Sequence, residues 1–269
     1  MPYNSIVIVR EIWDTRDLVG SIVEEGKIRE DKLTTRFEPE DLNALEMALR
    51  IKDRHGGKVI AISIGQPREV DVLRECLYRG ADEVIRLDDP TFADLDSLAA
   101  GYVLAQAIRR IGEFDLILSG VNVPEGENSL LASHIAQFLG VEQISYVDDI
   151  EEMSDGKIVC KKAVEMGYEF VEVKLPALLI VGVALVKDDP RAPRSAKARL
   201  KLKYKKTPIP AWRAEDIGVS DLSELKAVRV SGYDPIPEKA IKSKEIESKE
   251  VDPEDEKALK AMLSEILSG

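Results

Sequence analysis

The sequence predicts an α/β fold in which helices cover both faces of a parallel sheet. Short β-branched and apolar segments alternate with longer segments of helical periodicity over residues 5–140. Two of the helical segments end at a glycine, Gly80 or Gly140, as helices often do. Because parallel strands need long crossovers, this alternation favours βαβ units with right-handed connections.

The first three predicted strands are short segments rich in valine and isoleucine, which favour β-structure. They cover residues 5–9, 58–64 and 83–87. The first helix begins at Glu38-Pro-Glu-Asp41, because proline suits the first turn of a helix, and apolar residues at positions 42, 45, 49 and 51 form its buried face. A second helix covers residues 69–79. Between the first strand and the first helix the chain is polar, and Gly26 marks a candidate hairpin.

A long helix, a fourth strand and one further helix complete the alternation. Residues 95–111 place Leu98, Tyr102, Ala105 and Ile108 on one helical face. Residues 115–118 form the fourth strand, a glycine-containing loop follows at 120–128, and the next helix covers 129–139.

After Gly140 the pattern changes to a β-meander. Segments 146–153, 157–164 and 168–173 are separated by turn dipeptides and predict an antiparallel extension of the sheet. Residues 178–185 are almost wholly apolar, as in a strand buried on both faces. We therefore expect an α/β domain over residues 1–186.

Residues 187–269 are predicted to form an extended C-terminal arm. The segment from Lys187 contains six prolines between Pro190 and Pro237 and lacks regular alternation. A terminal helix is expected from about Asp252, with a single apolar stripe that needs a partner surface: Leu259, Met262, Leu263, Ile266 and Leu267.

Composition excludes several classes of protein. The net charge of −12 disfavours general nucleic-acid binding. Two cysteines cannot form a disulfide framework, and His55 and His134 offer little for a histidine-rich metal site or a Ser-His-Asp triad. No apolar run is long enough to cross a membrane, and the N-terminus does not resemble a secretory leader. We expect a cytoplasmic protein with no membrane insertion.

One segment is basic although the net charge of the chain is negative. Residues 187–206 hold nine Lys or Arg and two Asp, a local charge of +7, so the remainder carries about −19. Such a strip is either a solvated loop and strand edge or a docking segment for an acidic partner or phosphates.

The loops after the strands are the candidate ligand sites, because ligands bind beyond the carboxyl ends of parallel strands. These loops are residues 10–14, 63–67 and 120–128. The third is glycine-containing and leads into a helix, whose first N–H groups favour a phosphate, although a plain capped turn would look similar. Glu125 and Glu127 lie in this loop, but no pair of groups has the spacing of a hydrolase or a metal site. We therefore expect a nucleotide-binding or carrier protein without catalytic or metal-ligating residues of its own.

An ordered series of short motifs resembles the β (small) subunit of electron-transfer flavoproteins, up to about Val219. The N-terminal matches are Ile8-Val-Arg-Glu-Ile-Trp-Asp-Thr15, Glu38-Pro-Glu-Asp41, Ser63-Ile-Gly65, Arg79-Gly-Ala-Asp82 and Phe114-Asp-Leu-Ile-Leu-Ser-Gly120. The C-terminal matches are Lys174-Leu-Pro-Ala177, Asp189-Pro-Arg191 and Ala211-Trp-Arg-Ala-Glu-Asp-Ile-Gly-Val219. No single motif is specific, whereas their order and spacing are.

The resemblance implies a Rossmann-like sheet of the adenine-nucleotide α-hydrolase type and a heterodimer. A larger α subunit would hold the redox FAD, and this chain would hold AMP, or a second FAD in electron-bifurcating members. The implied adenine contacts are Ile8, Glu38, Pro39, Glu40, Asp41 and Ile64. The implied phosphate contacts are Gly120, Val121, Asn122, Val123, Pro124, Glu125, Gly126, Glu127, Asn128, Ser129, Leu130 and Leu131.

The resemblance also implies a recognition loop for a dehydrogenase or a quinone-reducing partner. The implied docking residues are Arg191, Arg194, Ser195, Lys197 and Arg199. Three positions differ from the family pattern: Leu130-Leu-Ala132 replaces Gln-(Thr/Val)-Gly, Glu38 replaces an Asn, and Ser195 or nearby basic residues replace an anchoring Leu.

The resulting prediction is a subunit of a flavin electron-transfer complex rather than an enzyme by itself. Two alternatives stay open. One is an electron-bifurcating β subunit whose second FAD takes a hydride from NADH. The other is a free-standing adenine-nucleotide protein, against which stand the long arm and the lack of a Ser-Gly-Gly-x-Asp-Ser loop.

Overall fold

The computed structural model describes residues 1–14, 16, 22–68, 70–93, 95–121, 130–154, 156–182, 193–222 and 225, and the single positions 257, 260 and 264. The chain divides into two compact units, residues 1–233 and 234–269, and every element below belongs to the first. The predicted terminal apolar stripe, Leu259 to Leu267, lies outside the described residues.

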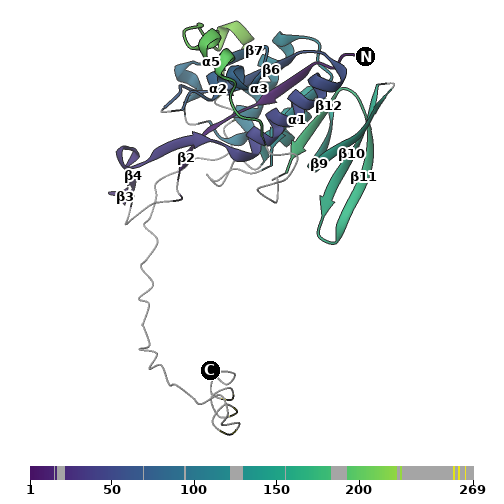
Figure 1. The fold of residues 1–269 in the computed structure, drawn as a ribbon. Helices are drawn as coiled ribbons and strands as arrows, with labels where there is room; N and C mark the ends of the chain where they lie inside the picture. The colour runs from purple at the N-terminus through teal and green to yellow at the C-terminus, as the bar shows by residue number, and fades with distance from the viewer. Residues whose placement is uncertain are drawn as a thin grey trace. The chain divides into compact units, whose positions relative to one another are not determined.

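A single large sheet organises the first unit, and Figure 1 shows its antiparallel end (β9–β11) beside β12. Within the described residues it has nine strands in the order β11-β10-β9-β12-β8-β1-β6-β7-β13. In chain order the strands are β1 (Ser5–Ile8), β6 (Val59–Ile64), β7 (Glu83–Leu87), β8 (Leu116–Gly120), β9 (Glu142–Ser154), β10 (Lys157–Val164), β11 (Gly167–Lys174), β12 (Ala177–Val181) and β13 (Ala211–Trp212). In the part of this order that runs β9-β12-β8-β1-β6-β7-β13, each strand is parallel to its neighbours. Strand β10 is antiparallel to both β9 and β11. The predicted parallel sheet with an antiparallel extension is confirmed.

Helices pack on both faces of this sheet. They are α1 (Pro39–His55), α2 (Val72–Arg79), α3 (Ser97–Ile111), α4 (Leu131–Leu139) and α5 (Ala198–Tyr204), with 3-10 turns η1 (Glu30–Lys32), η2 (Pro90–Phe92) and η4 (Glu215–Ile217). Because side chains alternate along a strand, Val7 of β1 joins the core under α1 and α2, while Ile6 and Ile8 join the core under α3 and α4. Among the described residues, no helix has both the length and the apolarity needed to cross a bilayer.

Aspartate caps place two helix starts later than the sequence periodicity predicts. The Asp71 side chain accepts a hydrogen bond from the backbone N–H of Arg74, so α2 begins at Val72 rather than at residue 69. Asp96 caps α3 in the same way through the N–H of Ala99, at 2.9 Å. Caps satisfy N–H groups that the first turn leaves free, which sets the boundary more sharply than apolar spacing does.

Two antiparallel strand pairs follow β1 in the described residues, and the sequence predicts the one at Gly26 but not the other. Strand β2 (Glu11–Asp14) pairs antiparallel with β5 (Thr34–Phe37), and β3 (Val23–Glu24) pairs with β4 (Lys27–Ile28). Glu25 and Gly26 have positive φ angles of 51° and 73°, so the candidate hairpin at Gly26 is confirmed.

The described part of the segment predicted as an extended arm lies on the sheet. Strand β13 pairs with β7, and Ile217, Val219 and Leu222 are buried in the core beside α3. Pro210 directly precedes β13 and Pro208 lies two residues earlier, and the edge of a sheet tolerates a residue without an N–H. Because these apolar residues are irregularly spaced, the periodicity of the sequence does not predict that they are buried. The domain boundary expected at residues 186/187 stays a prediction.

Helices α3 and α4 pack closely at Gly101, which gives a stability prediction. A Cβ added to Gly101 would lie 2.7 Å from the Cβ of His134 on α4. We expect Gly101→Ala to lower the free energy of unfolding by about 1–2 kcal/mol in urea denaturation, because the clash outweighs the better helix propensity of alanine.

Gly182→Ala is the control for this prediction. A Cβ there would meet nothing closer than 3.9 Å, so its effect should stay within about 0.5 kcal/mol. Equal effects of the two substitutions would contradict the close packing of α3 on α4.

Candidate functional site

A cavity of about 530 Å³ opens where β1 and β6 end. Its apolar walls come from β1, β2, β6, η2, α3, α4 and the segment before α3: Ile8, Ile12, Ile64, Phe92, Leu95, Leu104 and Leu131. Its polar lining includes Arg10, Glu11, Gln66, Arg68 and Arg86. This position is the one predicted for a ligand, at the carboxyl ends of parallel strands. The structure brings together Ile8, Ile64 and Leu131 from the predicted set.

Asp41 links the first turn of α1 to Arg10, which lines this cavity. Its side chain is fully buried and accepts hydrogen bonds from Nε and Nη2 of Arg10, both at 2.8 Å. It also accepts the backbone N–H of Gly120 at 2.9 Å. Burial alone would lower the pKa of Arg10, but the Asp41 carboxylate outweighs it and raises the pKa above its usual value.

Gly120 is the glycine that this arrangement requires. A Cβ there would lie 2.7 Å from Oδ1 of Asp41 and 2.8 Å from its backbone nitrogen. The end of β8 therefore lies directly against the first turn of α1.

Three buried acidic residues lie at the N-terminus of α1. Glu38 is its N-cap and is 3% exposed, and Glu40 and Asp41 in the first turn are buried as well, whereas Pro39 is exposed. One Glu38 oxygen accepts the Glu40 N–H at 3.5 Å, and the other, Oε2, has no hydrogen-bond partner in the described part of the chain. Burial, and then the charge of Asp41, raises the pKa of Glu38.

Helix α4 begins beside the cavity and has no side-chain cap. Its N-cap residue is Leu130, which offers no side-chain cap, and Leu131 lines the cavity. Val121 extends β8, and its N–H donates to the carbonyl of Val181. The predicted phosphate contacts Asn122, Val123, Pro124, Glu125, Gly126, Glu127, Asn128 and Ser129 lie outside the described residues.

The histidines and cysteines weighed as catalytic candidates lie elsewhere. His134 packs against α3 with Nδ1 buried, and His55 meets Tyr3 edge-on with ring centroids 5.5 Å apart. Cys76 and Cys160 are buried, and burial raises the pKa of Cys160 to about 12. The two cysteines are therefore core residues, whereas His55 is exposed and His134 is half-buried between α3 and α4.

Of the predicted docking residues, Arg194 is held within the chain and Arg191 lies outside the described residues. The Arg194 guanidinium donates to both carboxylate oxygens of Glu46, at 2.8 and 3.0 Å, and pairs with Asp53 at 2.8 Å. Burial alone would raise the pKa of Glu46, but the hydrogen bonds from Arg194 hold it below its usual value.

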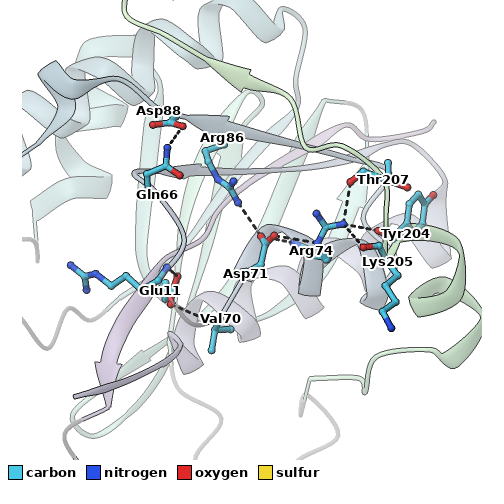
Figure 2. Close-up of polar contacts among 11 residues, drawn as sticks. Glu11, Gln66, Val70, Asp71, Arg74, Arg86, Asp88, Tyr204, Lys205 and Thr207 are labelled. Carbon is cyan, nitrogen blue, oxygen red and sulfur yellow. Dashed lines mark hydrogen bonds and ion pairs between the residues drawn. The ribbon is translucent and has the colours of Figure 1, made fainter. Parts of the chain in front are cut away.

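Several exposed basic residues lie on α5 and just before it. Ser195, Lys197, Arg199, Lys201 and Lys203 are exposed, and Leu202 among them is 83% exposed. Helix α5 is fixed to α2, since the Lys197 N–H donates to the Tyr78 carbonyl at 2.9 Å. Figure 2 shows Arg74 of α2 donating to three carbonyls at the other end of α5, those of Tyr204, Lys205 and Thr207.

Sequence reasoning missed two cations of the site. The loops predicted to meet at the cavity contain Arg10, Glu11 and Gln66, but Arg68 and Arg86 are not among the predicted contacts. Arg86 lies within β7, and its Nη2 pairs with Asp71 at 3.1 Å (Figure 2). A polar residue within a buried strand was the available signal for Arg86.

Comparison with known proteins gives one consistent answer. A family model described as "Electron transfer flavoprotein domain" matches residues 26–216. The chain is 35% identical to "Caffeyl-CoA reductase-Etf complex subunit CarD" of Acetobacterium woodii, over 80% of each chain. It is 35% identical to "Electron transfer flavoprotein subunit beta" of Thermoanaerobacterium thermosaccharolyticum, over 82% of each. It is 31% identical to "Protein FixA" of Azorhizobium caulinodans, over 81% of this chain and 78% of that one.

The buried Glu38 carboxylate gives a pH-dependent prediction. Because the folded chain raises its pKa, the ionised form is destabilising at neutral pH, and this cost disappears as the pH falls and the carboxyl is protonated in both states. We expect Glu38→Gln to raise the free energy of unfolding at pH 7 by about 1 kcal/mol and to leave it unchanged near pH 4.

Chemical denaturation at both pH values measures this difference. Glu113→Gln, at an exposed position, should change stability by less than about 0.5 kcal/mol at either pH. A Glu38→Gln variant less stable than wild type at neutral pH would contradict the assignment.

Proposed function

Because the chain belongs to the electron transfer flavoprotein family, among its β subunits, we propose that it forms a heterodimer with a larger α subunit that holds a redox FAD. The complex carries electrons between a dehydrogenase and a quinone or another acceptor. Related chains are named subunits of such assemblies, which supports a role within a complex.

This chain contributes an adenine-nucleotide site in the cavity at the ends of β1 and β6. Ile8, Ile64 and Leu131 offer apolar surfaces suited to a flat adenine ring. The α4 N-terminus, whose cap residue has no polar side chain, offers N–H groups and a helix dipole to a phosphate. The donor set therefore fits AMP, or the AMP portion of FAD.

The chemistry of the cavity supports binding rather than acid–base catalysis. Among its described lining residues the one carboxylate is Glu11, which already accepts two backbone N–H groups. Flavin supplies the electron-accepting chemistry when it is bound. The residues of this chain bind and orient the nucleotide and exclude water from its base.

The observation that carries the proposal is the joint position of the cavity and the α4 N-terminus, and nucleotide analysis tests it. The heterodimer is purified, denatured by heat, and its released nucleotides are counted per complex. One AMP with one FAD supports the proposal. Two FAD per complex would instead favour the electron-bifurcating alternative. One FAD with no AMP would refute a nucleotide site in this chain.

Gel filtration separates the remaining alternative. A chain that stays monomeric when co-expressed with an α subunit would favour a free-standing adenine-nucleotide protein over the proposed heterodimer.

We also expect helix α5 to dock on an acidic electron-transfer partner. Unlike Arg194, its exposed cations pair with no acid in the part of the chain that the structure describes, and opposed charges accelerate association. Replacing Lys197, Arg199 and Lys201 together by Gln should slow electron delivery about tenfold at low ionic strength and much less at high ionic strength. Stopped-flow rates across a salt series measure this.

The same number of charges can be removed elsewhere as a control. Replacing Lys157, Lys161 and Lys174 on β10 and β11 by Gln should leave the rate close to that of wild type, since these residues lie on the opposite end of the sheet. Equal slowing by both triple variants would mean that net charge, not α5, steers the partner.

A further inference from the structure

The carboxylate of Glu11 holds the loop between β6 and α2 in place through hydrogen bonds. Glu11 of β2 accepts the backbone N–H of Arg68 at 2.9 Å through Oε2 and that of Val70 at 2.8 Å through Oε1. The hydroxyl of Thr35, on the paired strand β5, donates to the same carboxylate. Figure 2 shows Glu11 beneath the loop, with Gln66 donating to Asp88 on its other side. The loop that carries Arg68 is therefore tied to β2 and to the end of β7.

Arg68 differs from the other arginines that line the cavity. Arg10 is neutralised by Asp41, and Arg86 by Asp71. The Arg68 guanidinium has no carboxylate partner among the described residues and lies 3.9 Å from the centroid of the Trp13 ring. Stacking on a tryptophan orients a guanidinium plane but leaves its N–H donors free for a ligand.

An uncompensated arginine in a cavity with apolar walls calls for an anion. A guanidinium presents parallel N–H donors that match two oxygens of a phosphate, and Arg68 is exposed, so a ligand in the cavity can reach these donors. Arg68 follows β6, whereas the α4 N-terminus follows β8, so the two anion-binding groups lie on different sides of β1 in the sheet order.

We propose that Arg68 binds a phosphate group of the nucleotide in this cavity and that Glu11 is the residue that positions it. The inference rests on the proposed nucleotide function and extends it, because it assigns an anion contact outside the loop that follows β8. The Trp13 ring holds the guanidinium in place before the ligand binds.

Calorimetric titration with adenosine and with ADP tests the phosphate contact. The full-length chain, purified with its α subunit and freed of bound nucleotide, is compared with Arg68→Gln. We expect the ADP affinity to fall about tenfold or more, and the adenosine affinity to stay unchanged, because only ADP offers the anion.

Arg110→Gln is the matched control. Arg110 also stacks on a tryptophan, 4.6 Å from the Trp212 ring centroid, but it lies at the far end of α3 from the cavity. It should leave both affinities unchanged, which separates the loss of one cation near a ligand from the loss of one charge on the chain.

A double-mutant cycle tests the positioning role of Glu11. Glu11→Ala should weaken ADP binding, and adding Arg68→Gln to it should cost little more, because both changes remove the same contact. Glu11→Gln, which keeps an oxygen acceptor, should restore part of the ADP affinity. Additive losses would show that Glu11 stabilises the fold without positioning Arg68.

Trp13 gives an independent readout. In a Trp212→Phe background Trp13 is the one remaining tryptophan, since the chain contains two. ADP should change its emission in the wild-type cavity and not in Arg68→Gln.

The outcomes distinguish this inference from the function on which it rests. If wild type binds both ligands and Arg68→Gln changes neither affinity, or lowers both equally, the assignment of Arg68 is wrong while the nucleotide site stands. If wild type binds neither ligand, both are overturned.

Discussion

One buried carboxylate brings together three parts of the chain that are far apart in sequence. Asp41 belongs to the first turn of α1, Arg10 follows β1, and Gly120 ends β8, yet Asp41 accepts hydrogen bonds from both of the others. A buried charge is tolerated only when it is paired and hydrogen-bonded, so each contact depends on the others. Gly120 is part of the same constraint, because any side chain there would enter the space that Asp41 fills. The edge of the sheet at which the cavity opens is thus held by charge and close packing together.

Helix α2 connects the cavity to the basic surface. At its N-terminus Asp71 caps the helix and pairs with Arg86, which lines the cavity. One turn later Arg74 holds the end of α5, and further on the Tyr78 carbonyl and Arg79 hold the segment before α5. Figure 2 shows this chain of contacts from Arg86 to Thr207. A short helix therefore sets the position of two surfaces that sequence analysis treated as unrelated.

The sequence predicts those parts of the molecule in which apolar spacing decides the structure. The strands containing Ile6, Ile62, Ile85 and Ile117 are buried on both faces, and their valine- and isoleucine-rich segments are unmistakable. The ribbon of β2 and β5 is not predicted, because its residues are polar and are stabilised by one another. The strand β13 is missed because it has two residues, too few to show a periodicity. For the site, two of the three loops predicted at the strand ends, residues 10–14 and 63–67, contribute to one cavity, whereas most of the third lies outside the described residues. Which arginine there retains an unpaired charge depends on acids distant in sequence, and no local pattern shows it.

The placement of β13 has a consequence for how the chain is made. Strand β7 ends at Leu87, and its outer edge is covered by β13 only from Ala211 onward. On a ribosome, more than a hundred residues are synthesised between the two, and during that time the edge of β7 presents free N–H and C=O groups to any neighbouring chain. The two-residue strand β13, which directly follows Pro210, closes that edge last. Truncation products that end before Ala211 would consequently share a common defect, an open sheet edge prone to aggregation, even though their parallel core is complete.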